Sequence, residues 1–237
     1  MPKAVLSSKV TDTLTVRITQ GDLRPGTLLP SERDLQAEFE VSRPVIREAI
    51  KTLAAKGLVS ITGQGTLVTA DYTTPALESL TRLLRHAQVN TDDIVDTRLL
   101  LEPLVASLAA VQAGALQKRH LRATNQQLIA LDAACGEVVD DKVAEVWFSH
   151  DAQFHALLAQ STQNPVLAIL IELIVGVLWR ERWTTYPNLP PSHRASVISA
   201  HSAVIDAIES HRPEAAAQAM RDHINDTKNF IAKKKSL

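Results

Sequence analysis

The stretch PGTLLPSERDLQAEFEVSRPVIREAIKTLAAKGLVSITGQGTLV, residues 25–68, decides the fold of the first part of the chain. Ser31 precedes Asp34 at the spacing of a helix capping box, which predicts a short helix over about 32–38. Ser42 can cap the next helix, which Gly57 ends. The core face of that helix is marked by apolar residues at 3.6-residue spacing: Ile46, Ala49, Ile50 and Leu53.

Two β-prone runs follow, residues 58–62 and 66–69, joined by Gly63-Gln64-Gly65, which predicts a hairpin. Before the quoted stretch, Val10, Leu14 and Ile18 form an apolar stripe that predicts a first helix ending before Gly21. Three helices and a hairpin predict a winged helix-turn-helix.

The remaining chain predicts an all-helical bundle, so the fold class is mainly α. Pro75 and its polar neighbours mark a linker, which gives a head over 1–72, a linker over 73–77 and a helical domain over 78–237. Long runs rich in Ala, Leu, Val and Ile predict helices at 77–88, 92–113, 116–134, 139–160, 165–183, 193–210 and 213–233. The apolar run 166–178 predicts the central helix of this bundle, with a dimer surface as the alternative.

Composition excludes several classes of protein. With 237 residues, 45% of them hydrophobic, and a net charge of -1, the chain can bury a core, and any nucleic-acid partner must be met by a local basic surface. The single cysteine, Cys135, excludes an internal disulfide, and we expect a cytoplasmic protein without a signal peptide. Glu172 interrupts the longest apolar run, which is too short to span a membrane.

A basic stripe lies on the third predicted helix. Arg43, Arg47 and Lys51 follow one another at four-residue spacing, beside the apolar face rather than on it. Arginine can donate two hydrogen bonds to guanine in the major groove. The alternative is an ordinary solvated helix face, which the stripe alone favours.

Asp151 and His155, at i and i+4, could bind one cation together. His201 and His223 lie about equally far from the turn at 211–213, so antiparallel helices would bring them to one level. Three imidazoles and a carboxylate suit a divalent transition metal, zinc above all, with nickel or manganese also compatible. The alternatives are a surface ion pair and core histidines with satisfied hydrogen bonds.

The quoted stretch resembles the DNA-binding domain of the GntR family of bacterial transcription regulators. The resemblance implies contacts to double-stranded operator DNA by Arg33, Ser42, Arg43, Arg47, Gln64 and Gly65. Gln64 departs from the arginine that this wing often carries, which bears on the operator sequence.

The segments DAQFHALL, AHSAVIDAI and MRDHINDT resemble the ligand segments of metal-binding FCD domains, the effector domains of the FadR branch of that family. The resemblance implies that Asp151, His155, His201 and His223 bind the metal and that Arg98 meets the carboxylate of an effector. A surface pair of Arg98 with Glu102 is the alternative. Asn225, Arg180 and Arg182 are weaker pocket candidates, and Trp179 and Trp183 are either a ligand wall or ordinary packing.

These expectations together describe a homodimeric transcription regulator, most often a repressor in this family, with no membrane partner. Its operator binding would respond to a small carboxylate effector, a hydroxy or sugar acid, because NPVLAILIELIVGVLWRERW resembles regulators of sugar-acid catabolism. Two alternatives remain at this point: a metal-dependent enzyme acting on a small organic acid, and a regulator whose zinc is purely structural.

Overall fold

The computed structural model describes residues 2–71, 73–137, 139–185 and 189–235, without the side chains of 179–185, 234 and 235. The chain forms two compact units, residues 1–79 and 80–237. The described part is mainly helical and contains one two-stranded antiparallel sheet. No helix within these ranges combines the length and the hydrophobicity needed to cross a bilayer.

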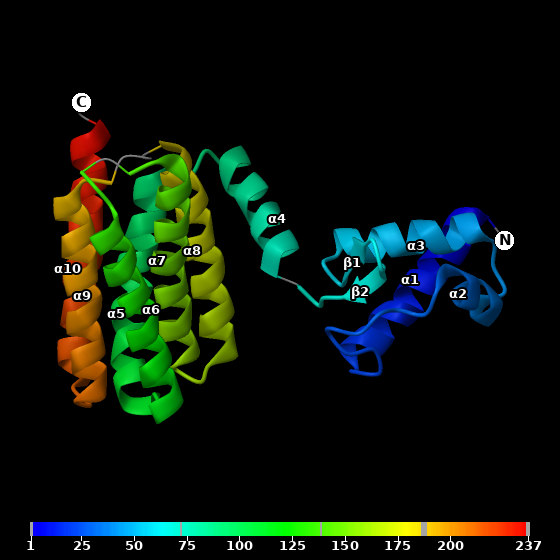
Figure 1. Cartoon of the computed structure of the whole chain (residues 1–237), viewed down its shortest axis with the longest axis horizontal. Helices are drawn as coiled ribbons and strands as arrows, with labels where there is room; N and C mark the ends of the chain where they lie inside the picture. Colours follow the sequence, from blue (N-terminus) through cyan, green and yellow to red (C-terminus); the bar gives the residue numbers. More distant parts are fainter. Residues whose placement is uncertain (1, 72, 138, 186–188, 236–237) are drawn as a thin grey trace. The chain divides into compact units, whose positions relative to one another are not determined.

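The first unit is a winged helix-turn-helix (Figure 1). It contains α1 (Lys3–Thr19), α2 (Glu32–Phe39), α3 (Arg43–Ala55), β1 (Val59–Thr62) and β2 (Gly65–Val68). The Ser31 hydroxyl accepts a hydrogen bond from the Asp34 amide at 3.2 Å, as the capping box predicts. Apolar side chains of the three helices meet in one core, which includes Leu14, Leu35 and Ile46. This core holds α3 by its apolar face and leaves its basic stripe exposed.

The wing differs in two details from the predicted hairpin. Gly65 is the first residue of β2, paired with Thr62, so the loop comprises only Gly63 and Gln64. The segment before α2 adds a third, short partner, because Leu28 forms a bridge with Leu67 and the Leu29 amide donates to the Thr66 carbonyl at 2.8 Å. This pairing joins residues almost 40 positions apart, which local patterns do not reveal.

The second unit is a helical bundle. Its helices are α4 (Thr73–His86, which starts in the first unit), α5 (Thr91–Gln112), α6 (Ala115–Ala134), α7 (Asp141–Gln160), α8 (Pro165–Thr185), α9 (Pro191–Glu209) and α10 (Pro213–Lys235). Figure 1 shows α5 to α10 side by side. Helix α4 already starts at Thr73, with Pro75 in its first turn, so the segment expected as a linker is helical. Asp71 accepts hydrogen bonds from the amides of Thr73 and Thr74 and so caps this helix.

The expectation that α8 is the central helix is wrong. Ile171, Val175 and Leu178 are buried, but Val166, Ile169 and Leu170 are exposed. The start of α8 lies beside the end of α5, where the Gln163 side chain donates to the Gln112 carbonyl at 2.9 Å. A helix that is apolar all round is therefore packed on one side only, and the other side of its first half is exposed.

Candidate functional site

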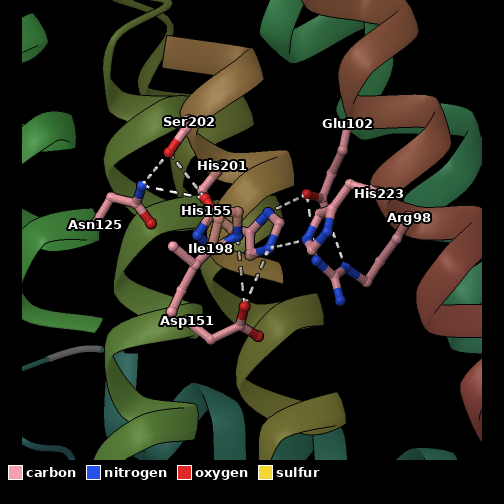
Figure 2. Close-up of polar contacts among 9 residues, drawn as sticks. All are labelled: Arg98, Glu102, Asn125, Asp151, His155, Ile198, His201, Ser202 and His223. Atoms are coloured by element: carbon pink, nitrogen blue, oxygen red, sulfur yellow. Dashed lines mark hydrogen bonds and ion pairs between the residues drawn. The ribbon is translucent and has the colours of Figure 1, made fainter. Parts of the chain in front are cut away.

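Four side chains from three helices converge in the interior of the bundle. Asp151 and His155 come from α7, His201 from α9 and His223 from α10. Each offers a ligand atom, and these atoms all lie within 4.8 Å of one another. All four residues are buried. Figure 2 shows the rings and the carboxylate pointing toward one another.

The positions of these residues in the sequence account for this convergence. Asp151 and His155 are one helical turn apart and share a face of α7. Helices α9 and α10 are joined by a tight turn in which His211 adopts a positive φ of 51° and Pro213 begins α10. The chain therefore runs back along itself, and the rings of His201 and His223 lie 4.8 Å apart.

His201 and His223 are suited to bind a cation in their neutral form. Burial lowers the pKa of both His201 and His223 well below the usual value, and the neighbouring positive charges add to this effect. His201 Nε2 lies 3.5 Å from Asp151 Oδ1, and the Nε2 atoms of His155 and His223 lie 3.3 Å apart. Lone pairs on imidazole nitrogens at such spacing are the ligands that zinc and related metals prefer.

His201 supplies the test of whether these residues fit a metal ion. Neither of its ring nitrogens forms a hydrogen bond within the described residues, although the side chain is completely buried. Its ring stacks on Phe154 with 3.7 Å between centroids. A buried polar group without a partner is costly, and a metal ion would satisfy it. The donor set and this unsatisfied ring both fit a divalent metal.

Arg98 pairs with Glu102, as in the alternative considered from the sequence, but the pair lies in the interior and not on the helix surface. Both side chains are 1% exposed. Glu102 also lies beside the cluster, because its Oε2 is 2.5 Å from Nδ1 of His155. Burial would raise the pKa of Glu102, but the charges of Arg98 and His155 outweigh it and hold that pKa well below its usual value. The carboxylate is therefore ionised between two cationic or proton-donating groups.

Other pocket candidates from the sequence do not join this cluster. Asn225 is half-buried on α10 and makes no side-chain hydrogen bond among the described residues. The side chains of Arg180, Arg182, Trp179 and Trp183 lie outside those that the structure describes. The other five histidines of the chain have no ligand atom in the cluster: His86, His120, His150, His193 and His211.

Sequence reasoning missed three buried polar residues. Glu102 entered only as a surface partner of Arg98. Asn125 on α6 donates to Ser202 at 2.9 Å, next to His201 in the chain, and its own oxygen is buried without a hydrogen bond in the described part (Figure 2). Arg194 on α9 is bound by Asp132 and by the carbonyls of Leu189 and Gly136. For Glu102 and Arg194 the signal in the sequence was a charged residue on an otherwise apolar helix face, and Asn125 gave no such signal.

The first unit presents its candidate DNA contacts to solvent. The side chains of Arg33, Arg43 and Arg47 are 94%, 67% and 62% exposed. Glu32 at the start of α2 lies 2.7 Å from Arg43 and 3.8 Å from Arg47. On binding DNA, these arginines would therefore lose only surface ion pairs, which contribute little to stability.

Ser42 and the wing complete this surface. Ser42 occupies the N-cap position of α3, but its hydroxyl makes no capping hydrogen bond, contrary to the sequence expectation, and it is exposed. Gln64 and Gly65 are exposed at the tip of the wing, where Gly65 has a φ of 135° that favours glycine. An unused hydroxyl and backbone amides at a helix start are suited to bind a phosphate.

Comparisons with known proteins agree with this architecture. A family model described as bacterial regulatory proteins, gntR family, matches residues 6–68, and the FCD domain model matches residues 93–226. The HTH-type transcriptional regulator YieP of Escherichia coli K12 is 31% identical over 219 residues, which are 90% of this chain and 90% of YieP. The HTH-type transcriptional repressor NanR of Escherichia coli is 28% identical over 227 residues, which are 93% of this chain and 82% of NanR.

Solved structures show the same likeness. Streptococcus agalactiae GntR superposes with a TM-score of 0.69 at 25% identity, and the match covers 94% of this chain and 99% of that one. Escherichia coli McbR/YncC shares the fold, with a TM-score of 0.52 at 16% identity over 97% of this chain and 98% of its own. The relatives and neighbours are transcription regulators rather than enzymes. The chain belongs to the GntR family of bacterial regulatory proteins and carries an FCD domain behind its gntR-type head.

Proposed function

We propose that this protein is a cytoplasmic homodimeric repressor whose operator binding is controlled by a small carboxylate metabolite, a hydroxy or sugar acid. The effector binds at a divalent metal ion, zinc, held by Asp151, His155, His201 and His223. One observation carries the proposal: four buried ligand groups converge within 4.8 Å of one another, close to a buried arginine. This arginine, Arg98, is linked to the cluster by Glu102, which contacts both Arg98 and His155. The curated relative NanR is named a repressor, which supports the direction of regulation.

The head reads duplex DNA through α3 and the wing. Arg43 and Arg47 approach base edges in the major groove, Arg33 and Ser42 bind the backbone, and Gln64 and Gly65 reach it from the wing. The exposure of the three arginines and the unused Ser42 hydroxyl support these roles. Because phosphate contacts release counterions, operator affinity falls steeply with salt concentration.

The bundle senses the effector. A bound zinc ion would supply a Lewis-acid position for a carboxylate oxygen. Arg98 offers a fork of donors to the same carboxylate, in exchange for part of its contact with Glu102. Asn225 serves as a further polar contact only if α10 turns it toward the site, since its side chain has no partner in the described structure.

An apolar surface on α5 and α8 supports the homodimer. Leu100, Leu104 and Val111 form one stripe on α5 and are 79%, 57% and 64% exposed. Val166 and Ile169, at the adjoining start of α8, are exposed as well. In a dimer formed through this surface, a two-fold axis would relate the two heads, as an inverted-repeat operator requires. The effector causes release of DNA if it binds more tightly to the arrangement of the dimer that cannot bind DNA. The difference between its affinities for the two arrangements is the whole free energy available for switching.

The test combines thermal unfolding with operator binding. A panel of hydroxy and sugar acids is screened with zinc and with a chelator, and acids that stabilise the zinc-loaded protein are added to the protein bound to a labelled DNA fragment from its own genomic neighbourhood. We expect such an acid to lower DNA affinity in the unsubstituted protein but not in His223→Ala. An unchanged response of His223→Ala would refute the metal-dependent effector site.

The same experiment separates the alternatives. Zinc that stabilises the bundle while no acid alters DNA binding would indicate a structural metal. Chemical conversion of a stabilising acid by the zinc-loaded protein would indicate an enzyme.

A further inference from the structure

Glu102 on α5 contacts two functionally distinct residues of the candidate site. Its Oε2 lies 2.5 Å from Nδ1 of His155, and its Oε1 accepts from Nε of Arg98 (Figure 2). We propose that Glu102 is a positioning residue, which orients the ring of His155 for metal binding and divides its carboxylate between His155 and Arg98. The inference rests on the metal site of the proposed function and adds a residue to it.

The contact with His155 determines which ring nitrogen faces the cluster. To bind a metal, the imidazole of His155 must be neutral, with its proton on one nitrogen only, and a carboxylate at 2.5 Å from Nδ1 favours the proton there. Nε2 then keeps its lone pair on the side where His223 Nε2 lies at 3.3 Å and Asp151 Oδ1 at 3.9 Å. Nδ1 and the Glu102 oxygen are in ion-pair contact without the alignment of a hydrogen bond. A carboxylate beside the second ring nitrogen strengthens and orients a histidine as a metal ligand.

The contact with Arg98 weakens the interaction of the Glu102 carboxylate with His155. Nη2 of Arg98 lies 3.4 Å from the same Oε2 that faces His155, so the two partners share one oxygen. Within the described part of the chain, Glu102 is the only side chain that pairs with this buried guanidinium. A buried arginine without a carboxylate is unfavourable, so Glu102 stays with it unless another anion arrives. A carboxylate bound to Arg98 would free Glu102 to act on His155 alone.

The sharpest test compares two double variants that differ only in the acceptor for His155. Arg98→Met/Glu102→Gln and Arg98→Met/Glu102→Leu both lack the buried ion pair, but only the glutamine oxygen can accept from Nδ1. The metal-free proteins are titrated with Co2+, whose visible spectrum reports ligand geometry. We expect the leucine variant to bind Co2+ about 10- to 100-fold more weakly than the glutamine variant and with a changed spectrum. Glu145→Gln, an exposed substitution on α7, is the control and should bind as the unsubstituted protein does.

A second comparison tests whether Arg98 and His155 share the carboxylate. Arg98→Met should raise Co2+ affinity several-fold when Glu102 is present, because the full carboxylate then faces His155. In the Glu102→Gln background the same substitution removes only a nearby positive charge, so the gain should be smaller. Equal gains in the two backgrounds would refute the sharing.

Thermal unfolding of each metal-free variant separates positioning from stability. A residue with only a structural role would lower the unfolding temperature and leave the Co2+ affinity and spectrum of the folded protein unchanged. Co2+ affinities of the two double variants within about twofold of each other would overturn the role of Glu102. Absence of Co2+ uptake by the unsubstituted protein would instead overturn the metal site of the proposed function, and this inference with it.

Discussion

Replacing His201 by leucine should stabilise the metal-free protein and abolish its response to zinc. His201 is completely buried, and neither ring nitrogen forms a hydrogen bond within the described residues. An apolar side chain of similar size removes that unsatisfied polar group. The substitution therefore distinguishes a histidine that binds a ligand from one that stabilises the core. Replacing a histidine that only packs in the core would lower the stability of the metal-free protein.

The magnitude follows from two opposing terms. Removing a buried polar group without a partner gains about 1–3 kcal/mol. Losing the stack of His201 on Phe154, with centroids 3.7 Å apart, costs about 0.5–1.5 kcal/mol. With the middle of each range, about 2 and about 1 kcal/mol, the net gain is about 1 kcal/mol, which corresponds to a rise in Tm of about 2–4 °C for a unit of this size. Zinc at 100 times its Kd would stabilise the unsubstituted protein by about 2.7 kcal/mol, so zinc should raise its Tm by about 5–11 °C.

The assay is thermal unfolding of both proteins with a chelator and with zinc. His193→Leu is the matched control, because His193 lies on the same helix and stacks on Phe230, with centroids 3.8 Å apart, but has no ligand atom in the cluster. The control should keep the zinc response and gain no stability. A metal-free His201→Leu protein that unfolds below the unsubstituted one would refute the argument from the unsatisfied ring, and a retained zinc response would refute the site.

Three further predictions concern the head and the dimer. Arg47→Ala should weaken operator binding by about 1–3 kcal/mol in fluorescence anisotropy, and equal affinity would reject a base contact by this side chain. Gly57→Ala should destabilise the head by more than about 1 kcal/mol in calorimetry, because φ is +72° there and a Cβ would lie 1.8 Å from the Asp71 carbonyl oxygen; an unchanged unfolding temperature would contradict this. Leu104→Asp should convert the proposed dimer to a monomer in sedimentation, because it places a charge on the exposed apolar stripe of α5. A persistent dimer would place the interface elsewhere.

Local signals predicted most of the head. The Ser31 cap is present and α3 begins one residue after Ser42, because these features depend on neighbours within one helical turn. The pairing of Leu28 with the wing was not predicted, because it depends on a partner far along the chain. Pro75 was misleading as a break, since a proline in the first turn of a helix forfeits no hydrogen bond.

Patterns of hydrophobicity predicted the helices of the bundle but not which of them lies at its centre. A helix that is apolar on every side can be central or can lie at an interface between subunits, and α8 has an exposed apolar side. Counting residues to the turn placed His201 and His223 together because a tight turn fixes the register of antiparallel helices. Glu102 has no such constraint, since the contact of α5 with α7 depends on the packing of the whole bundle.

Helix α5 carries the candidate sensor and the candidate dimer surface on opposite faces. Arg98 and Glu102 point into the bundle, whereas Leu100 and Leu104 are exposed, and positions two apart on a helix lie about 200° around its axis. In the proposed dimer, any shift of α5 that accompanies effector binding would therefore move the stripe against the partner copy. Linkage makes this effect reciprocal. If an acid changes the equilibrium constant for dimerisation by some factor, its affinities for the dimer and for two separate subunits must differ by the same factor. In the proposed dimer, sensing and the presentation of two heads to DNA would thus be coupled through α5, and this coupling is measurable without DNA.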